Sequence, residues 1–272
     1  MTKQNLHTHS TYCDGIDTLE DIVKEAILED FDSIGFSSHA YTGFAFDDCG
    51  IESEEKVSEY INEIADLKKK YQDRIKIYTG LELESKNDNI AVDKRLDYSI
   101  GSVHCFWLRD KVFSVDYTPE MFEEARDYIG GIRELVENYY NEIIRFASIS
   151  NYDITGHIDL VTKFNEIKDW DFEKESWYRD IAIAALDCAI DNDKLIEVNT
   201  GAISRGYRTT PYPAPFLLER AKEKNAHMIL SSDCHNKKWL SYAFNSSLDR
   251  LKEYGFSNLY FLTKEGFKPE AI

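Results

Sequence analysis

The stretch MILSSDCH at residues 228–235 joins three apolar residues to an aspartate and a histidine that stand two positions apart, Asp233 and His235. A short apolar run that ends in small polar residues is typical of a buried strand and the loop after it. A carboxylate beside an imidazole at such a place can be half of a metal site, a catalytic pair or an accident of the surface. The rest of the sequence has to decide between these three interpretations.

Similar short apolar segments alternate with amphipathic helical segments along the chain. Helices are predicted from about Thr18 and over residues 57–67, 119–149 (interrupted at Gly130 and Gly131), 177–190, 214–224 and 246–254. Strands are predicted near Leu6 and at SIGFSSH (33–39), IKIYTGLELE (75–84), DYSIGSVH (97–104), YDITGH (152–157), KLIEVNT (194–200), HMILSSD (227–233) and NLYFLT (258–263). This alternation predicts an α/β fold with parallel strands and crossover helices. Seven or eight such units favour a barrel, and 272 residues favour one domain over residues 1–272.

The composition excludes several classes of partner. A formal net charge of −18 argues against nucleic acid, because phosphate-backbone binding needs clustered Lys and Arg. No apolar run reaches the length of a membrane-spanning helix, and the start MTKQNLHTHS lacks the apolar core of a signal peptide. The five cysteines are odd in number and show no Cys-x-x-Cys spacing, which is typical of reduced thiols. We therefore expect a cytoplasmic protein of undetermined oligomeric state.

The histidines mark the site most clearly. Six of the seven lie at or just past the C-terminal end of a predicted strand: His7, His9, His39, His104, His157 and His235. Barrel enzymes build their active sites at that edge, so the pattern predicts one convergent site. His227 lies at the start of a strand and is interpreted as structural.

Carboxylates accompany these histidines. In an extended chain, residues two apart point to the same face, so His7 and His9 can reach one ion. Asp14 belongs to Cys-Asp-Gly, which by itself favours an ordinary turn. Glu82 and Glu84 share one strand face, and one of them is expected to bridge metals while the other supports it or is exposed.

The residue types and their number suggest which metals bind. Imidazoles with carboxylates suit Zn, Mn or Fe rather than Ca or Mg. Nine candidate ligands exceed what one tetrahedral ion can use, so two or three divalent ions are expected, sharing a carboxylate.

The motifs in their order resemble those of the PHP (polymerase and histidinol phosphatase) superfamily. These motifs are His-Thr-His at 7–9, Asp14, His39, GLE at 80–82, GSVH at 101–104, GHID at 156–159 and SSDCH at 231–235. The resemblance implies a distorted (β/α)7 TIM-like barrel with its active site at the C-terminal ends of the strands and a metal centre in which Glu82 is the bridge. It assigns the ligand positions to His7, His9, Asp14, His39, Glu82, His104, His157, Asp233 and His235.

Within the superfamily, EVNTGAISRGYRTTPYP at 197–213 resembles the histidinol-phosphate phosphatase branch. The resemblance implies that basic side chains hold the phosphate, at Arg205 after the Asn-Thr pair and at Lys163 after GHID. Arg208 is an alternative to Arg205. A lysine is a point charge without the fork of arginine, so Lys163 remains open to interpretation as a surface residue.

The resemblance implies hydrolysis of L-histidinol phosphate to L-histidinol and phosphate, a step of histidine biosynthesis. We expect an in-line attack by a metal-bridging hydroxide held by His7, His9, Glu82 and Asp233, without a phosphoenzyme. Asp159 is interpreted as a partner of a ligating histidine, and Phe106, Trp107 and Glu197 as candidate contacts to the substrate's amine and imidazole. Two alternatives stay open. The chain could be a PHP phosphoesterase for another small phosphate ester or a nucleotide, or a non-catalytic metal-binding module.

Overall fold

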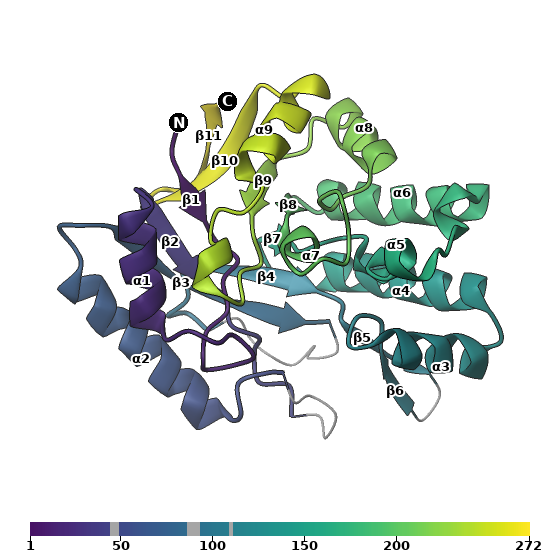
Figure 1. Cartoon of the computed structure of the whole chain (residues 1–272), viewed down its shortest axis with the longest axis horizontal. Coiled ribbons are helices and arrows are strands. Elements are labelled where there is room, and N and C mark those ends of the chain that lie inside the picture. Colours follow the sequence, from purple (N-terminus) through teal and green to yellow (C-terminus); the bar gives the residue numbers. More distant parts are fainter. Residues whose placement is uncertain (44–48, 86–92, 109–110) are drawn as a thin grey trace.

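A parallel sheet of seven strands forms the centre of the described part of the chain (Figure 1). The structure is a computed structural model that describes residues 1–43, 49–85, 93–108 and 111–272. In order across the sheet, the strands are β1 (Gln4–Asn5), β2 (Ser33–Phe36), β3 (Lys76–Glu84), β4 (Tyr98–Ser102), β7 (Ile154–Thr155), β8 (Leu195–Asn199) and β9 (Met228–Ser231). Each neighbouring pair is parallel, as the strand–helix alternation predicts.

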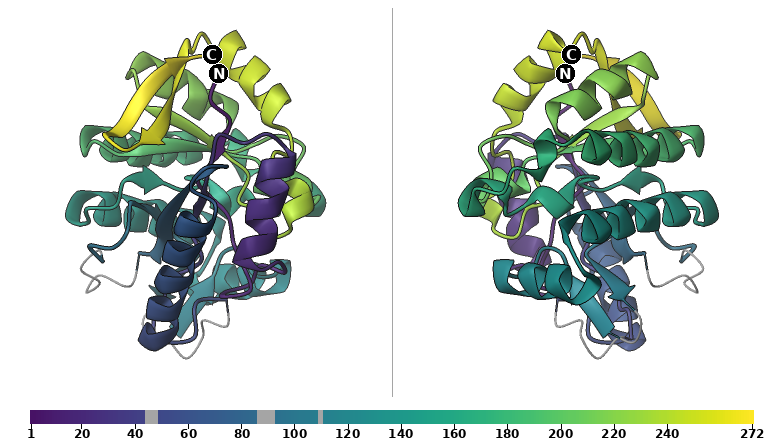
Figure 2. Two further views of the ribbon diagram at one scale, coloured as in Figure 1. Left: turned by 90° about the vertical axis from the view of Figure 1, so that its left-hand side faces the viewer. Right: turned by 90° about the vertical axis from the view of Figure 1, so that its right-hand side faces the viewer.

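Helices lie outside the strands on several sides (Figures 1 and 2). The α-helices are α1 (Leu19–Leu28), α2 (Glu54–Lys70), α3 (Pro119–Ile129), α4 (Ile132–Ile149), α5 (Asn165–Lys168), α6 (Ser176–Asp191), α7 (Gly201–Ser204), α8 (Pro215–Glu223) and α9 (Phe244–Glu253). Three short 3-10 turns are η1 (Leu160–Thr162), η2 (Phe172–Lys174) and η3 (Lys237–Trp239). In Figure 1, α1 and α2 lie on the left beside the first strands, and α4 and α6 lie together on the right.

The sheet curves until its first and last strands meet. Beyond the regular strands, Thr8 and Cys234 form a parallel bridge. The main-chain nitrogen of His9 donates to the carbonyl of Cys234 at 2.9 Å, and the nitrogen of Cys234 donates to the carbonyl of His7 at 3.1 Å. The result is a nearly closed seven-stranded barrel, which confirms the predicted fold class.

The helix ends follow local sequence signals. The side chain of Thr18 accepts a hydrogen bond from the main chain of Asp21 and caps α1. Gly130 ends α3 in a left-handed conformation, with φ of 111°, which a residue without a Cβ adopts at low cost. The predicted interruption at Gly130 and Gly131 is therefore a real break between α3 and α4.

The barrel interior is apolar toward one end and polar toward the other. Tyr78, Gly80 and Glu82 share one face of β3, because side chains alternate along a strand. A Cβ on Gly80 would lie 2.5 Å from the Tyr98 ring, so this glycine makes room for a tyrosine that crosses the interior. Tyr98 packs in an apolar cluster with Leu6, Tyr78, Ile100, Ile154, Leu195, Ile229 and Leu262. Glu82 stands at the opposite, polar end of the same face.

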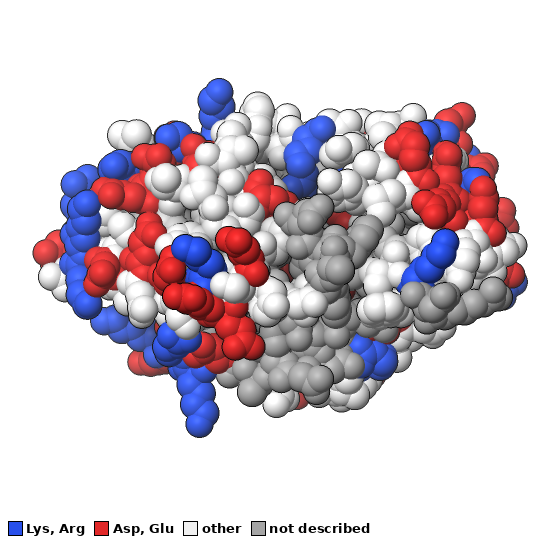
Figure 3. Space-filling view, turned by 90° about the horizontal axis from the view of Figure 1, so that it is seen from below, with Lys and Arg blue, Asp and Glu red and all other residues white. Residues whose placement is uncertain are grey.

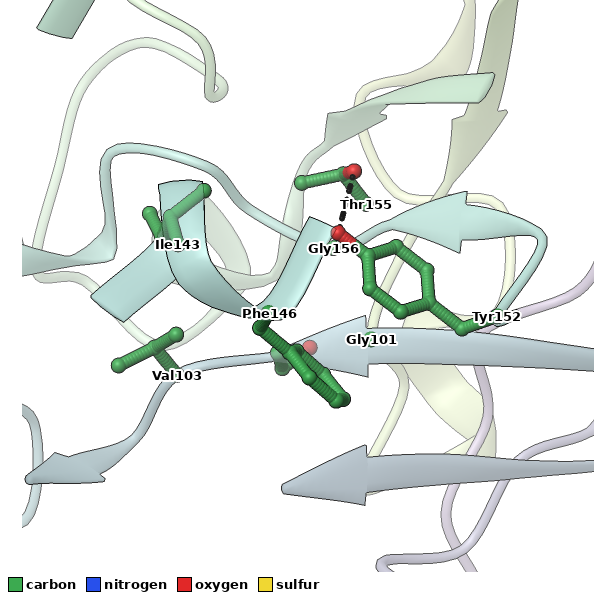
Figure 4. A pocket seen from close by; sticks show the side chains of 8 residues that line it. Gly101, Val103, Ile143, Phe146, Tyr152, Thr155 and Gly156 are labelled. Atoms are coloured by element: carbon green, nitrogen blue, oxygen red, sulfur yellow. Dashed lines mark hydrogen bonds between the residues drawn. The ribbon is translucent and has the colours of Figure 1, made fainter. Parts of the chain in front are cut away.

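A second close contact lies where β4 and β7 are neighbours, between Gly101 and the ring of Tyr152. A Cβ on Gly101 would lie 2.4 Å from the Tyr152 ring, which packs against the strand (Figure 4). The Tyr152 hydroxyl lies 3.3 Å from Oγ1 of Thr155, beside a small internal cavity of about 10 Å³. The Tyr152 ring therefore lies outside the barrel, between its strands and α4, with its centroid 4.8 Å from that of the Phe146 ring.

The described residues also form two antiparallel hairpins outside the sheet. The predicted strand NLYFLT is β10 (Asn258–Thr263), but it pairs with β11 (Gly266–Ala271) and not with the barrel. The second hairpin is formed by β5 (Cys105–Leu108) and β6 (Lys111–Ser114), and the sequence analysis missed it. The main chain of β10 at Leu262 exchanges two hydrogen bonds with the Gln4 side chain, so β10 covers the apolar end of the barrel.

The two chain termini lie side by side (Figures 1 and 2). The main-chain nitrogen of Thr2 donates to Oε1 of Glu270 at 2.7 Å. Among the described residues, none of the helices has the length and apolarity needed to cross a bilayer.

Candidate metal centre

The C-terminal ends of the strands bring together all nine residues that the sequence predicts as ligands. Seven of them line a pocket of about 590 Å³, and the other two, His7 and His9, are fully buried beneath it. Within the described residues, the ligand atoms form four overlapping groups, and in each group every atom lies within 4.8 Å of the others. The groups are His7–His9–Asp233, His7–Glu82–His157, His39–Glu82–His104 and His9–Asp14–His39–His235.

Glu82, near the end of β3, stands at the centre of this arrangement. Its Oε2 faces three imidazole nitrogens, Nε2 of His7 at 3.1 Å, Nδ1 of His39 at 3.1 Å and Nε2 of His9 at 3.5 Å. Its Oε1 faces two more, Nε2 of His157 at 3.0 Å and Nε2 of His104 at 3.3 Å. A carboxylate whose two oxygens face different sets of imidazoles has the geometry of a bridge between two ions.

Asp233 extends the cluster from the loop after β9. Its Oδ1 lies 3.2 Å from Nε2 of His9, 3.5 Å from Nδ1 of His235 and 3.6 Å from Nε2 of His7. Its φ of 48° is left-handed, a conformation that aspartate adopts more readily than most residues. The period-two spacing in the sequence therefore places Asp233 and His235 at one site, although the backbone between them is not a regular strand.

Asp14 fits both roles that the sequence suggests, a turn residue and a candidate metal ligand. It lies in a turn, and its carboxylate lies 3.1 Å from Nε2 of His235, 3.6 Å from Nδ1 of His9 and 3.8 Å from Nε2 of His39. The turn thus places the Asp14 carboxylate beside the imidazoles of His9, His39 and His235.

The donor set suits divalent cations. Among the described residues, the buried atoms Nε2 of His7, Nε2 of His9 and Oε2 of Glu82 have no hydrogen-bond partner, although burying a polar group without a partner is costly. Ligands about 2.0–2.2 Å from one ion lie about 3–4 Å from each other, which matches the separations above. Cations between these atoms would satisfy all three.

The ionisation states of Glu82 and His9 suit metal ligands, whereas neighbouring carboxylates raise the pKa of His7 and His104 against the effect of burial, so a cation has to displace the protons of those two imidazoles. Burial alone would raise the pKa of Glu82, but His7, His39 and His104 hold it well below its usual range. Burial, with the neighbouring His235 and His39, lowers the pKa of His9 to about 3. An ionised carboxylate and a neutral imidazole are the forms that bind metals.

Two buried glutamates hold the imidazoles in place. Glu197, fully buried on β8, has its Oε1 2.7 Å from Nδ1 of His7, and its Oε2 accepts from the main-chain nitrogen of His157 at 2.8 Å. Glu84 accepts from the main-chain nitrogen of His104 at 3.0 Å and lies 3.1 Å from Nδ1 of the same residue. Such outer carboxylates fix the orientation of a ligating histidine. Glu84 therefore supports the site, as the sequence allowed, while Glu82 occupies its centre.

Basic side chains line the pocket next to these groups. Arg205 donates from Nη2 to Oδ2 of Asp233 at 2.8 Å, and Lys163 donates to the carbonyl and the carboxylate of Asp116, at 2.7 and 3.2 Å. Arg208 does not line the pocket, because its guanidinium is buried against Thr162 and Glu173. Of the two arginines that the sequence left open, Arg205 is the one at the pocket.

Several sequence interpretations need correction. Asp159 does not support a histidine, since its Oδ2 accepts from the main-chain nitrogen of Ala214 at 2.7 Å and its Oδ1 has no hydrogen-bond partner in the described part of the chain. Phe106 is 2% exposed and belongs to the core, and Glu197 lies beneath His7 rather than in the pocket. His227 needs no correction: it was interpreted as structural, and its ring stacks on Tyr260 with 4.1 Å between ring centroids.

The sequence analysis missed two contributors. Asp116 lines the pocket after β6, and Ser102 donates to Oε1 of Glu82 at 2.6 Å. The signal for Ser102 was present, because it shares a face of β4 with Tyr98 and Ile100 and therefore points into the barrel. Asp116 follows a hairpin that the periodicity does not reveal.

Comparisons with known proteins agree with this geometry. The model of the PHP domain family matches residues 5–201. The histidinol-phosphatase of Bacillus subtilis is 30% identical over 269 residues, which cover 92% of this chain and all of that protein. The histidinol-phosphatase of Lactococcus lactis is 26% identical and covers 95% of this chain and 94% of its own length.

A solved structure shares the fold. The histidinol phosphate phosphatase of Lactococcus lactis, complexed with zinc, L-histidinol and phosphate, has a TM-score of 0.77 at 23% identity, and the match covers 98% of this chain and 99% of that one. The chain therefore belongs to the PHP domain family, in the branch of the histidinol-phosphatases.

Proposed function

We propose that this protein hydrolyses L-histidinol phosphate to L-histidinol and phosphate with the help of two or three divalent ions. The observation that carries the proposal is the Glu82 carboxylate, which faces five imidazoles at the base of a pocket that Lys163 and Arg205 also line. The relatives named histidinol-phosphatase support the substrate, and the zinc in the Lactococcus structure supports zinc as one of the metals, beside Mn and Fe.

The nine residues of the centre would hold the ions, with Glu82 shared between two of them. Divalent ions at such a site supply a nucleophilic hydroxide at neutral pH and neutralise the charge on the phosphoryl and leaving oxygens. The chain's own contribution is to fix the ligands. Glu197 holds His7, Glu84 holds His104 and Ser102 holds Glu82, so little reorganisation is needed when substrate binds.

Arg205 and Lys163 would bind the phosphoryl oxygens. Arg205 already spans Asp233 and His235, with its Nη1 2.8 Å from Nδ1 of His235, which directs the guanidinium toward the metal centre. Asp116 holds the Lys163 ammonium at the pocket wall. These cations would attract an anionic substrate into a protein whose net charge is −18.

The proposal also covers the domain organisation, the class of substrate and the cellular location. We propose that residues 1–272 act as one domain, because a single apolar cluster draws residues from Leu19 to Phe261. On the face in Figure 3, Lys and Arg lie among Asp and Glu on the left, Asp and Glu prevail on the right, and the described residues between them are mostly uncharged. Such a surface supports a small-molecule substrate rather than nucleic acid. The relatives' name, histidinol-phosphatase, supports a role in histidine biosynthesis, for which we propose a cytoplasmic location.

The test is a substrate panel on the metal-loaded protein combined with elemental analysis. The panel contains L-histidinol phosphate, p-nitrophenyl phosphate, a nucleoside monophosphate and a sugar phosphate. We expect kcat/KM for L-histidinol phosphate to exceed the others by about 100-fold or more, since selective contacts to a leaving group contribute a few kcal/mol. Equal turnover of all esters would favour a general PHP phosphoesterase, and a metal-loaded protein without turnover would favour a binding module.

A further inference from the structure

Arg208 is a buried arginine outside the pocket, and its surroundings give it a different role from that of Arg205. Its side chain is about 5% exposed, whereas the side chain of Arg205 is 26% exposed and lines the pocket. Burying a guanidinium is costly unless its hydrogen bonds are made within the protein. The partners of Arg208 therefore indicate what it is for.

The Arg208 guanidinium lies 5.2 Å from the centroid of the Tyr212 ring in its own segment, while its side-chain hydrogen bonds and ion pairs go to the segment that follows β7. Nη1 of Arg208 donates to the carbonyl of Thr162 at 3.0 Å and also to the Thr162 hydroxyl, and it lies 3.7 Å from Oε1 of Glu173. The next residue, Thr209, donates its main-chain nitrogen to Oε2 of Glu166 at 2.8 Å. Residues 208 and 209, which follow α7, are thus joined by hydrogen bonds and an ion pair to residues 162–173, which follow β7.

These two segments also carry the two basic residues that line the pocket, Lys163 and Arg205. Lys163 directly follows Thr162, the residue that Arg208 holds, and Arg205 lies three residues before Arg208. Between them, the Lys163 ammonium lies 5.0 Å from the centroid of the Tyr207 ring. The separation of Lys163 and Arg205 therefore depends on contacts that Arg208 makes.

We propose that Arg208 is a positioning residue that sets the spacing of Lys163 and Arg205 for a phosphoryl group by tying their two loops together. The inference rests on the proposed function, because it takes a phosphate ester as the ligand of the two cations. Two charges bind a dianion well only if their spacing matches its oxygens, and an error near 1 Å is costly. Arg208 itself touches neither substrate nor metal in this arrangement.

The experiment measures binding of inorganic phosphate by calorimetry, together with kcat and KM, for the metal-loaded wild type and variants. Arg208→Ala should raise the phosphate Kd and KM by about 10-fold while the bound metal is unchanged, and kcat should fall less than 3-fold. Arg205→Ala should raise the phosphate Kd by about 10- to 100-fold, the range for a lost charged hydrogen bond. Arg220→Ala is the matched control, because Arg220 pairs with Asp187 on the helices α8 and α6 and should leave phosphate binding unchanged.

A double-mutant cycle separates positioning from an independent contribution. If Arg208 acts through Arg205, the effect of Arg208→Ala on the phosphate Kd should shrink in the Arg205→Ala background. Additive effects, or an unchanged Kd in Arg208→Ala, would overturn the proposal. If the alanine variant does not fold, Arg208→Lys replaces it. A lysine cannot reproduce the fork of arginine, so its phosphate Kd should still rise about 3-fold, and a wild-type Kd would overturn the proposal.

The two proposals fail in different ways. A wild type that binds phosphate, loses that binding in Arg208→Ala and never turns over L-histidinol phosphate contradicts only the proposed substrate. A wild type that is active on this substrate, with Arg208→Ala indistinguishable from it, contradicts only the positioning role.

Discussion

Oε1 of Glu197 lies 2.7 Å from Nδ1 of His7, deep beneath the pocket, where both side chains are fully buried. The same carboxylate accepts hydrogen bonds from the hydroxyl of Ser231 and from the main-chain nitrogen of His157. One residue on β8 therefore orients the imidazole of His7, two residues past the end of β1, and the backbone after β7. We therefore expect the proposed metal centre to depend on this glutamate, which belongs to none of the four groups of candidate ligands.

Glu197→Gln tests this dependence. An amide cannot accept a hydrogen bond at both positions, and it leaves His7 less basic, so we expect metal affinity to fall about 10- to 100-fold and turnover to fall with it. Metal titration and kcat at saturating metal measure the two effects. Glu223→Gln, exposed on α8, is the control. Unchanged metal affinity would mean that His7 is held in place without Glu197.

Replacing a central ligand should have a larger effect. His9→Ala removes an imidazole that faces both Glu82 and Asp233, and Glu82→Ala removes the shared carboxylate. We expect each variant to lose bound metal and nearly all turnover, because the nucleophile and the charge neutralisation both depend on the ions. Elemental analysis and single-turnover assays measure this. Near-normal activity with less metal would contradict the proposed centre.

The stability of the fold should show a pH dependence that arises from Asp159. Burial raises the pKa of Asp159 from 3.8 to about 6, although the Arg208 guanidinium opposes this shift. Between about pH 4 and pH 6 the folded chain then binds more protons than the unfolded chain, so this group makes the free energy of unfolding fall as the pH rises. A shift of two units corresponds to about 3 kcal/mol.

The comparison that isolates this effect is Asp159→Asn. The amide does not titrate, so the unfolding free energy of the variant relative to the wild type should rise by up to about 3 kcal/mol from pH 4 to pH 7. Urea unfolding at a series of pH values measures it in the metal-loaded protein. Parallel curves for the two proteins would show that Asp159 has an ordinary pKa.

Gly80→Ala should disturb the site through the barrel interior. The added Cβ would lie 2.5 Å from the ring of Tyr98, so strand β3 or the ring has to move, at a cost of about 1–3 kcal/mol. Glu82 stands two residues further along the strand, and metal affinity should fall as well. Denaturant unfolding and metal titration follow both effects. Tyr98→Leu in the same chain should recover part of the loss, and strictly additive effects would argue against this contact.

The sequence by itself predicted the parallel barrel and the end of it that carries the site. Apolar segments with period-two and helical spacing set the order of strands and helices, and parallel strands place their C-terminal ends at one edge. Because the six histidines lie at or just past strand ends, local pattern was enough to group them, whereas Asp14 and the choice of Glu82 over Glu84 came from the resemblance to the PHP superfamily. The strand NLYFLT shows the limit, since its pattern predicted a strand but not the hairpin in which it pairs.

Only the tertiary structure decided which side chains meet. Glu82 and Glu84 share one strand face, yet one faces five imidazoles and the other holds His104, because their neighbours come from other strands. The choice between Arg205 and Arg208 and the positions of Glu197 and Asp159 likewise depend on contacts between residues far apart in the chain. Periodicity reports the face on which a side chain lies, while the partner across the barrel depends on packing of the whole sheet.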